Sequence, residues 1–146
     1  MIVLDANLLI YAYDESSLHH KKARKWVEKA LSGSESVAIP LQTIAAFLRI
    51  MTHRGLPAPR FTIEEAVEIV DAWFDQPNTR MITPDDDHWH LLRQVLLDGQ
   101  VCGPLATDAQ LAAITMEYGG TLYSTDRDFA RFPGLRWKNP LASTKR

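Results

Sequence analysis

The sequence predicts an α/β fold, a three-layer α/β/α sandwich with a central parallel sheet of four or five strands. Short apolar segments recur along the chain, longer amphipathic segments lie between them, and turn-forming residues separate the two kinds. Strands that alternate with helices form right-handed crossovers, which give a parallel sheet with helices on both faces. No internal repeat, linker or low-complexity segment interrupts the chain, so we expect residues 1–146 to form a single domain.

The strands are expected where short apolar runs end at a turn or at the start of a helix. The first run, Met1–Leu4, is apolar at every position, as in a strand that is buried on both faces of a parallel sheet. The other strand candidates, in chain order, are Val37–Ile39, Arg80–Thr83, Thr121–Tyr123 and Arg136–Lys138.

Helices are expected between these strands, where apolar residues recur at intervals of three and four. The clearest start is Thr62-Ile-Glu-Glu65, which has the spacing of a capping box and precedes an apolar series. Other starts are expected at capping residues or just after a strand. These are Asn7, Ser16 or Ser17, Leu41, Asp85 or Asp86, and Thr107, with helix ends near Tyr13, Leu31, His53 and Tyr118.

The composition is that of a globular protein from a reducing compartment. The chain is 46% hydrophobic and 23% charged, which argues against wholesale disorder. No apolar run approaches the roughly 20 residues needed to span a bilayer, and the apolar start has no basic leader of the kind a signal peptide carries. Cys102 is the only cysteine and forms no internal disulfide. We therefore expect a cytoplasmic protein without a membrane partner.

The distribution of charge is more informative than the net charge of −2. From Ser36 to Ile63 the chain contains no carboxylate, although Arg49, His53, Arg54 and Arg60 all lie in this stretch. A mildly acidic protein can therefore still present a positively charged surface beside an acidic pocket.

Three aspartates fall where a strand is expected to give way to a loop or a helix. Asp5 ends the first apolar run, Asp108 opens the apolar segment that follows Thr107, and Asp126 ends Thr121-Leu-Tyr-Ser-Thr-Asp126. Open α/β sheets bind their ligands just outside the carboxyl ends of the strands. Carboxylates gathered there form a hard-oxygen site that suits Mg²⁺, with Mn²⁺ as a possible substitute. This arrangement points to metal-assisted phosphoester chemistry.

Each aspartate alone has an ordinary structural interpretation, since Asp is common in turns and at helix N-termini. Asp108 can serve as a first-turn acid favoured by the helix dipole, and Asp126 can belong to an exposed loop. The three together are more specific, because converging carboxylates repel one another unless a cation lies between them.

Several segments resemble the PIN domain family and, within it, the VapC toxins of bacterial toxin–antitoxin pairs. The resemblance covers essentially the whole chain in the right order and spacing. The segments that carry it are Ile2-Val-Leu-Asp5-Ala-Asn7, Thr107-Asp108-Ala109 with Leu111-Ala-Ala113, and Ser124-Thr-Asp126-Arg-Asp-Phe129.

The resemblance implies a Mg²⁺-dependent endoribonuclease that a cognate VapB-type antitoxin holds inactive and that forms a homodimer. Asp5 and Asp108 match the principal metal ligands of the family, and Asp126 matches the acid that completes the catalytic pocket. Asp128 matches a frequent additional acid, although a loop role fits it equally well. The segment Gly55–Phe74 is a candidate docking ground for the antitoxin or for a second copy of the chain.

One position departs from the family pattern. Most PIN domains carry a glutamate in the helix after the second strand, in a pattern like Glu-Leu-Leu-Arg, whereas this chain has Ala46-Phe-Leu-Arg49. Gln42, Ala46 and Arg49 share a helical face, so Gln42 could hold a metal-bound water and Arg49 could touch a phosphate. The ordinary alternatives, a solvated glutamine and a surface arginine, stay open. The loss of the glutamate weakens the case for two tightly held metals more than the case for one.

Two alternative functions are also compatible with an α/β fold. A PIN-like module disabled at Ala46 would bind RNA without cleaving it. A haloacid-dehalogenase-type phosphatase needs an aspartate two residues after the first, where this chain has Asn7. No GxxxxGK[ST] or GxGxxG motif is present, so nucleoside-triphosphate and dinucleotide enzymes fit poorly.

Overall fold

The computed structural model of the protein describes residues 1–55 and 60–143. Its strands form a five-stranded sheet in the order β3-β2-β1-β4-β5, and every neighbouring pair is parallel. The strands are β1 (Ile2–Leu4), β2 (Val37–Pro40), β3 (Thr79–Ile82), β4 (Thr121–Tyr123) and β5 (Trp137–Lys138). The predicted parallel sheet is therefore confirmed, with all five candidate segments in it.

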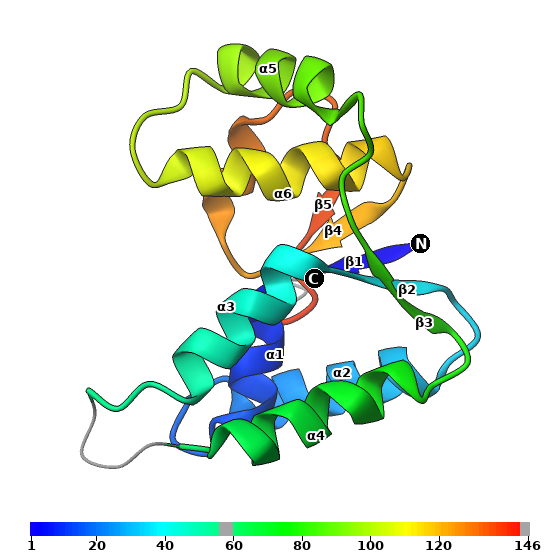
Figure 1. The fold of residues 1–146 in the computed structure, drawn as a ribbon, viewed down its shortest axis with the longest axis vertical. Coiled ribbons are helices and arrows are strands. Elements are labelled where there is room, and N and C mark those ends of the chain that lie inside the picture. The colour runs from blue at the N-terminus through cyan, green and yellow to red at the C-terminus, as the bar shows by residue number, and fades with distance from the viewer. Residues whose placement is uncertain (56–59, 144–146) are drawn as a thin grey trace.

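Helices cover both faces of the sheet, as predicted for a three-layer sandwich. In Figure 1, α5 and α6 lie on one side of the strands and α1 to α4 on the other. The helices are α1 (Ala6–Tyr13), α2 (His20–Ser32), α3 (Leu41–Met51), α4 (Ile63–Phe74), α5 (His88–Gly99) and α6 (Leu105–Glu117), with a short 3₁₀ helix η1 (Arg127–Arg131). Among the described residues, no helix is both long and apolar enough to cross a membrane.

Two apolar cores form because successive side chains of a strand point to opposite faces of the sheet. Leu4 of β1 packs with Phe47 and Trp73 on the side of α1 to α4. Val3, the residue before it, packs with Ile114 on the side of α5 and α6. This burial on both faces explains why the first strand is apolar at every position.

The capping box predicted at the start of α4 is present. The Thr62 hydroxyl accepts the Glu65 backbone N–H at 3.1 Å, and the Glu65 carboxylate accepts the Thr62 backbone N–H at 2.9 Å. The prediction succeeded here because both partners of the motif lie within four residues, so local sequence alone determines the contact.

The caps predicted at Ser16 or Ser17 are wrong, because α2 begins only at His20. The Ser16 hydroxyl donates to the Asp14 carboxylate at 2.6 Å, and the Ser17 hydroxyl accepts the His19 N–H at 3.1 Å. Both side chains therefore build the turn between α1 and α2.

The expected opening of α5 at Asp85 or Asp86 is also too early, since α5 begins at His88. The Asp85 carboxylate accepts the Asp87 N–H at 2.9 Å, which makes it part of the preceding turn.

The start predicted for α6 at Thr107 is late, because the helix already begins at Leu105. Pro104 directly precedes it and its carbonyl accepts the Thr107 N–H at 3.2 Å, so Thr107 is inside the first turn. As a consequence, Asp108 lies in the first turn of a longer helix, where the helix dipole favours a negative charge.

A buried threonine ties α3 to the end of the first strand. Thr43 is 2% exposed, and its hydroxyl donates to the Leu4 carbonyl at 2.8 Å. Because Asp5 follows Leu4 directly, this bond also fixes the backbone from which Asp5 extends. The α3 helix is thereby held against the carboxyl edge of the sheet.

We expect Thr43→Val to lower the free energy of unfolding by about 1 kcal/mol, because the Leu4 carbonyl loses a buried donor while the side-chain volume hardly changes. Urea unfolding followed by circular dichroism measures this loss. Thr121→Val is the matched control, since the Thr121 side chain makes no hydrogen bond within the described residues. An equal effect of the two substitutions would show that the Thr43 hydroxyl contributes nothing specific.

Candidate active site

Asp5 is placed at the carboxyl end of β1, where it begins α1. Its backbone is extended, with φ −82° and ψ 151°, and its carboxylate accepts the Ala6 N–H at 2.7 Å. Its own N–H donates to the Tyr123 carbonyl of β4 at 3.1 Å. Asp5 is therefore an N-cap that the neighbouring strand holds in register.

Asp126 occupies the equivalent place after β4. Its carboxylate accepts the Asp128 N–H at 2.9 Å and so caps η1. Because β1 and β4 are adjacent and parallel, Asp5 and Asp126 lie at the same edge of the sheet. The two carboxyl groups also interact electrostatically. Burial raises the pKa of Asp5, and the charge of Asp126 raises it further.

Asp108 comes to this edge from the first turn of α6. Carboxylate oxygens of Asp108, Asp126 and Asp128 lie within 4.8 Å of one another. Asp128, for which the sequence left a loop role open, therefore belongs to the acidic group. Asp5 is outside this closest trio, yet its charge also raises the pKa of Asp108. The three predicted aspartates are thus gathered in one place, with Asp128 as a fourth acid.

A buried serine donates a hydrogen bond to Asp5. The Ser124 oxygen accepts hydrogen bonds from the Asn7 amide at 3.1 Å and from the Asp126 N–H at 3.0 Å. Its single hydroxyl proton is then free to point at the Asp5 carboxylate, which lies 2.7 Å away. Burial raises the pKa of Asp5, and this hydrogen bond together with that from Ala6 opposes the rise. Ser124 thus favours the ionised form of Asp5.

Asn7 is the residue of the site whose role the sequence did not reveal. Its amide N–H group also donates to the Thr125 hydroxyl at 2.9 Å, so it joins α1 to the loop after β4. Its carbonyl oxygen is buried and has no hydrogen-bond partner among the described residues. The sequence did contain one signal for this role. Asn7 follows Asp5 by two residues, so both side chains lie at the start of the same helix.

Mutual repulsion is strongest at Asp108. Burial, followed by the charges of Asp126, Asp5 and Asp128, raises its pKa to about 6, and Arg131 of η1 partly counteracts this. At neutral pH the carboxyl is mostly ionised but is held among like charges. A cation bound among these carboxylates would offset the repulsion between them.

The α3 helix borders the site on its other side. The Gln42 amide lies 3.5 Å from the Thr107 carbonyl at the start of α6, at the long limit of a hydrogen bond. Ala46, one turn further, is half-buried, and Arg49 is exposed. The structure therefore places Gln42, as predicted, beside the acidic group, and α3 contributes no carboxylate there.

Comparison with known proteins establishes the family. The PIN domain family model matches residues 2–135. Ribonuclease VapC37 of Mycobacterium tuberculosis is 37% identical over 145 residues, which cover 97% of this chain and 99% of that protein. The chain belongs to the PIN domain family, and its nearly full-length similarity to a VapC protein confirms the branch that the sequence motifs indicated.

Solved structures share the fold at lower sequence identity. VapBC2 from Rickettsia felis, bound to a DNA fragment from its promoter, has a chain with a TM-score of 0.71 and 16% identity, covering 95% of this chain and 98% of that one. Mycobacterium tuberculosis VapC20, a sarcin-ricin loop cleaving toxin, has a TM-score of 0.66 and 16% identity, covering 93% and 99%. At these identities the likeness shows the fold alone.

The raised pKa of Asp108 has a consequence for stability in the absence of metal. Its pKa is 3.8 ordinarily and about 6 in the folded chain, so ionisation destabilises the folded state and the full penalty applies above pH 6. We therefore expect Asp108→Asn to stabilise the metal-free protein at pH 7, by about 1 kcal/mol once solvent screening of this partly exposed side chain is allowed for.

Thermal unfolding in a chelating buffer at several pH values tests this expectation. The gain should fade as the pH falls from 6 toward 3.8, because the Asp108 carboxyl is then protonated in both states. Asp71→Asn on the exposed face of α4 removes the same charge away from the site and serves as the control. A gain from Asp108→Asn that did not vary with pH would refute the repulsion account.

Proposed function

We propose that this protein is a Mg²⁺-dependent endoribonuclease that acts as the toxin of a type II toxin–antitoxin pair and hydrolyses RNA phosphodiesters. The observation that carries the proposal is the convergence of Asp108, Asp126 and Asp128 within 4.8 Å, next to the buried carboxylate of Asp5. Membership of the PIN family and similarity to a protein named as a ribonuclease support it.

The donor set fits a divalent cation of the hard-oxygen class. Mg²⁺ usually binds through one or two protein carboxylates and keeps several waters, and Mn²⁺ accepts the same ligands. Asp5, Asp108 and Asp126 would hold the ion, and Asp128 is close enough to join them or to bind one of its waters. The unpartnered carbonyl oxygen of Asn7 offers an additional acceptor next to Asp5.

The chemistry needs few further groups. A bound Mg²⁺ lowers the pKa of a coordinated water and polarises a phosphoryl oxygen. Hydrogen bonds from Ser124 and Ala6 orient the Asp5 carboxyl and partly oppose the rise in its pKa that burial causes. A carboxylate of the cluster that is not engaged as a ligand orients the attacking water and accepts its proton. In-line attack then leaves a 5′-phosphate and a 3′-hydroxyl.

The proposed partners are a VapB-type antitoxin and a second copy of the chain. The fold is shared with a chain of VapBC2 from Rickettsia felis, which supports assignment to such a pair. Part of the predicted docking ground Gly55–Phe74 is apolar and accessible, since Ile63 is 50% and Val67 is 44% exposed on α4. Residues 56–59 of that segment lie outside the described residues.

A second candidate function is an RNA-binding module with weakened catalysis. The observation that favours it is Ala46, which lies in α3 where the PIN pattern has a glutamate. Such a protein would bind RNA but would not cleave it when Mg²⁺ is added.

We expect the purified chain to cleave structured RNA in Mg²⁺, and Asp5→Asn and Asp108→Asn to reduce the rate at least about a hundredfold, because each removes a proposed ligand of the ion. Gel analysis of a structured RNA with and without a chelator measures this, and Asp71→Asn is the surface control. Equal cleavage by the unaltered chain and both site variants would rule out the assignment. Binding without cleavage by the unaltered chain would favour the RNA-binding module.

We expect Ala46→Glu to tighten Mn²⁺ binding about tenfold, because it adds a carboxylate to the side of the site that α3 leaves uncharged. Isothermal titration calorimetry measures the affinity. Ala72→Glu is the matched control, since Ala72 is exposed on α4, outside the candidate site. Unchanged affinity in Ala46→Glu would mean that this position does not face the ion.

A further inference from the structure

We propose that the side of α3 facing the acidic cluster binds the RNA backbone, with Arg49 holding a phosphate next to the one that is cleaved. This inference rests on the proposed nuclease function and adds a substrate-binding surface to it. We call this surface the α3 face and define it by Gln42, Ala46 and Arg49, together with His53 just beyond the helix end.

Helical geometry places these residues on one side. Positions 42, 46 and 49 are separated by four and three residues, so their side chains lie above one another along α3. The contact of Gln42 with the Thr107 carbonyl turns this side toward the start of α6, where Asp108 lies. At a rise of about 1.5 Å per residue, Arg49 lies roughly 10 Å further along the helix axis. It therefore lies on the same side of α3 as Gln42, further from the start of α6 and outside the acidic cluster.

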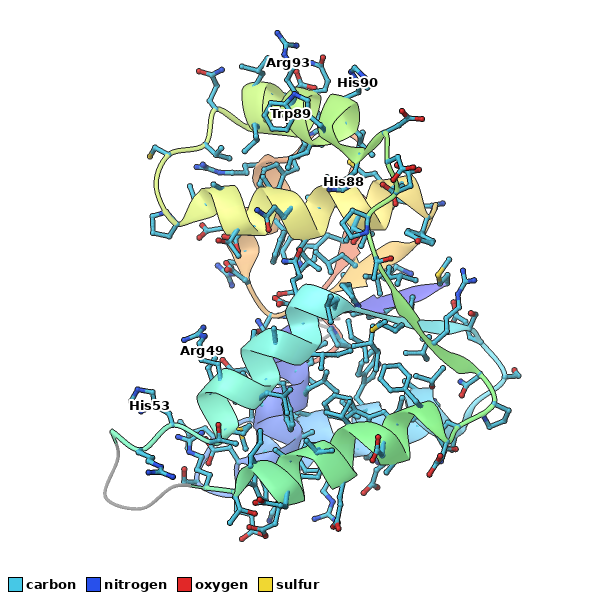
Figure 2. All side chains as sticks on the ribbon, viewed as in Figure 1. Arg49, His53, His88, Trp89, His90 and Arg93 are labelled. Atoms are coloured by element: carbon cyan, nitrogen blue, oxygen red, sulfur yellow. The ribbon has the colours of Figure 1, made fainter. Side chains whose placement is uncertain are left out.

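The side-chain view agrees with this placement. Figure 2 shows Arg49 extending outward from α3, with His53 beyond the helix end. A strand of RNA that crosses the acidic cluster and continues along α3 would pass Arg49 first and His53 next.

Charge balance explains why such a contact is needed. Asp5, Asp108, Asp126 and Asp128 together carry four formal negative charges when ionised. One divalent ion and the charge of Arg131, which already acts on Asp108, leave the cluster negative. RNA is itself a polyanion, so the flanking phosphates require cations from another element. The α3 helix supplies one and brings no carboxylate of its own.

Arg49 is available for a ligand, unlike Arg24 and Arg60, which are held in ion pairs. Arg60 pairs with Asp14 at 3.1 Å, and Arg24 pairs with Glu28 at 2.9 Å. Arg49 is exposed and forms no ion pair within the part of the chain that the structure describes. The planar guanidinium matches two phosphate oxygens at once, which makes arginine a specific phosphate ligand.

His53 extends the α3 face with a second donor. Its Nδ1 accepts the Gly55 backbone N–H at 2.8 Å, which leaves the proton of a neutral ring on Nε2. Because His53 is exposed, this Nε2–H is directed to solvent or to a bound strand. The α3 face thus offers donors to RNA, whereas the site itself offers acceptors to the metal.

The test measures RNA binding separately from cleavage. In the Asp108→Asn background, anisotropy of a fluorescent single-stranded RNA of mixed sequence reports affinity over a series of salt concentrations. We expect Arg49→Gln to weaken binding about tenfold at low salt and to reduce the slope of log affinity against log salt by about 0.7. Arg49→Lys should keep most of that slope and recover part of the affinity, because it retains the charge but lacks the planar fork.

Arg93→Gln is the matched control, because Arg93 is also exposed but extends from α5 away from α3 (Figure 2). It should leave both affinity and salt slope unchanged. In the otherwise unaltered chain, Arg49→Gln should raise KM with little change in kcat, as expected for a contact that binds substrate and transition state equally. Circular dichroism melting checks that each variant remains folded.

The outcomes separate this inference from the proposed function. Equal RNA affinities for Arg49→Gln and Arg93→Gln overturn the inference and leave the nuclease assignment intact. Absence of metal-dependent cleavage by the unaltered chain, with the Arg49 effect on binding preserved, overturns the nuclease assignment and supports the α3 face as an RNA-binding surface.

Discussion

The parallel pairing of β1 with β4 holds the acidic site together, because it brings the carboxyl ends of two strands that are distant in sequence to the same edge of the sheet. Leu4 is in register with Tyr123, so the residues that follow, Asp5 and Ser124, become neighbours across the strand boundary. The hydrogen bond from Ser124 to Asp5 and the amide bridge from Asn7 to the β4 loop then complete the contact. The remaining acids are added to this frame by α6 and η1.

The paired strands β1 and β4 hold several negatively charged side chains close together, which is electrostatically unfavourable. Four carboxylates lie near one another, and burial followed by their repulsion raises the pKa of Asp108. The buried hydrogen bond from the Thr43 hydroxyl to the Leu4 carbonyl holds the backbone directly before Asp5. A site of this kind is arranged for a cation in advance, and stability is lower in the metal-free state than it would be with neutral side chains.

The sequence was sufficient for those features that depend on local patterns. The burial of both faces of β1 and the capping box at Thr62 were predicted correctly, because period and spacing within a few residues determine them. The sheet-edge positions of Asp5 and Asp126 followed from the rule that ligands bind at the carboxyl ends of parallel strands. Two features of the site were left open or missed, because they depend on how distant segments fold back. The place of Asp128 in the cluster and the link from Asn7 through Ser124 require knowledge of how η1 and the β4 loop fold back.

Helix starts failed for a related reason. Thr107 and Ser17 are good capping residues by type, but Pro104 begins α6 earlier and the turn after α1 occupies the Ser17 hydroxyl. Competing local hydrogen bonds of similar strength decided these boundaries. The error shifted Asp108 by one turn in the helix but left it at the same edge of the sheet.

The position of β4 late in the chain also governs when the site can come into existence during synthesis. Asp5 and its partner Ser124 are separated by 119 residues, so nearly the whole chain must leave the ribosome before they can meet. A polypeptide released before β4 is complete carries neither Ser124 nor Asp126 and has no assembled acidic edge. Such a truncated product lacks the acidic edge on which the proposed nuclease activity depends.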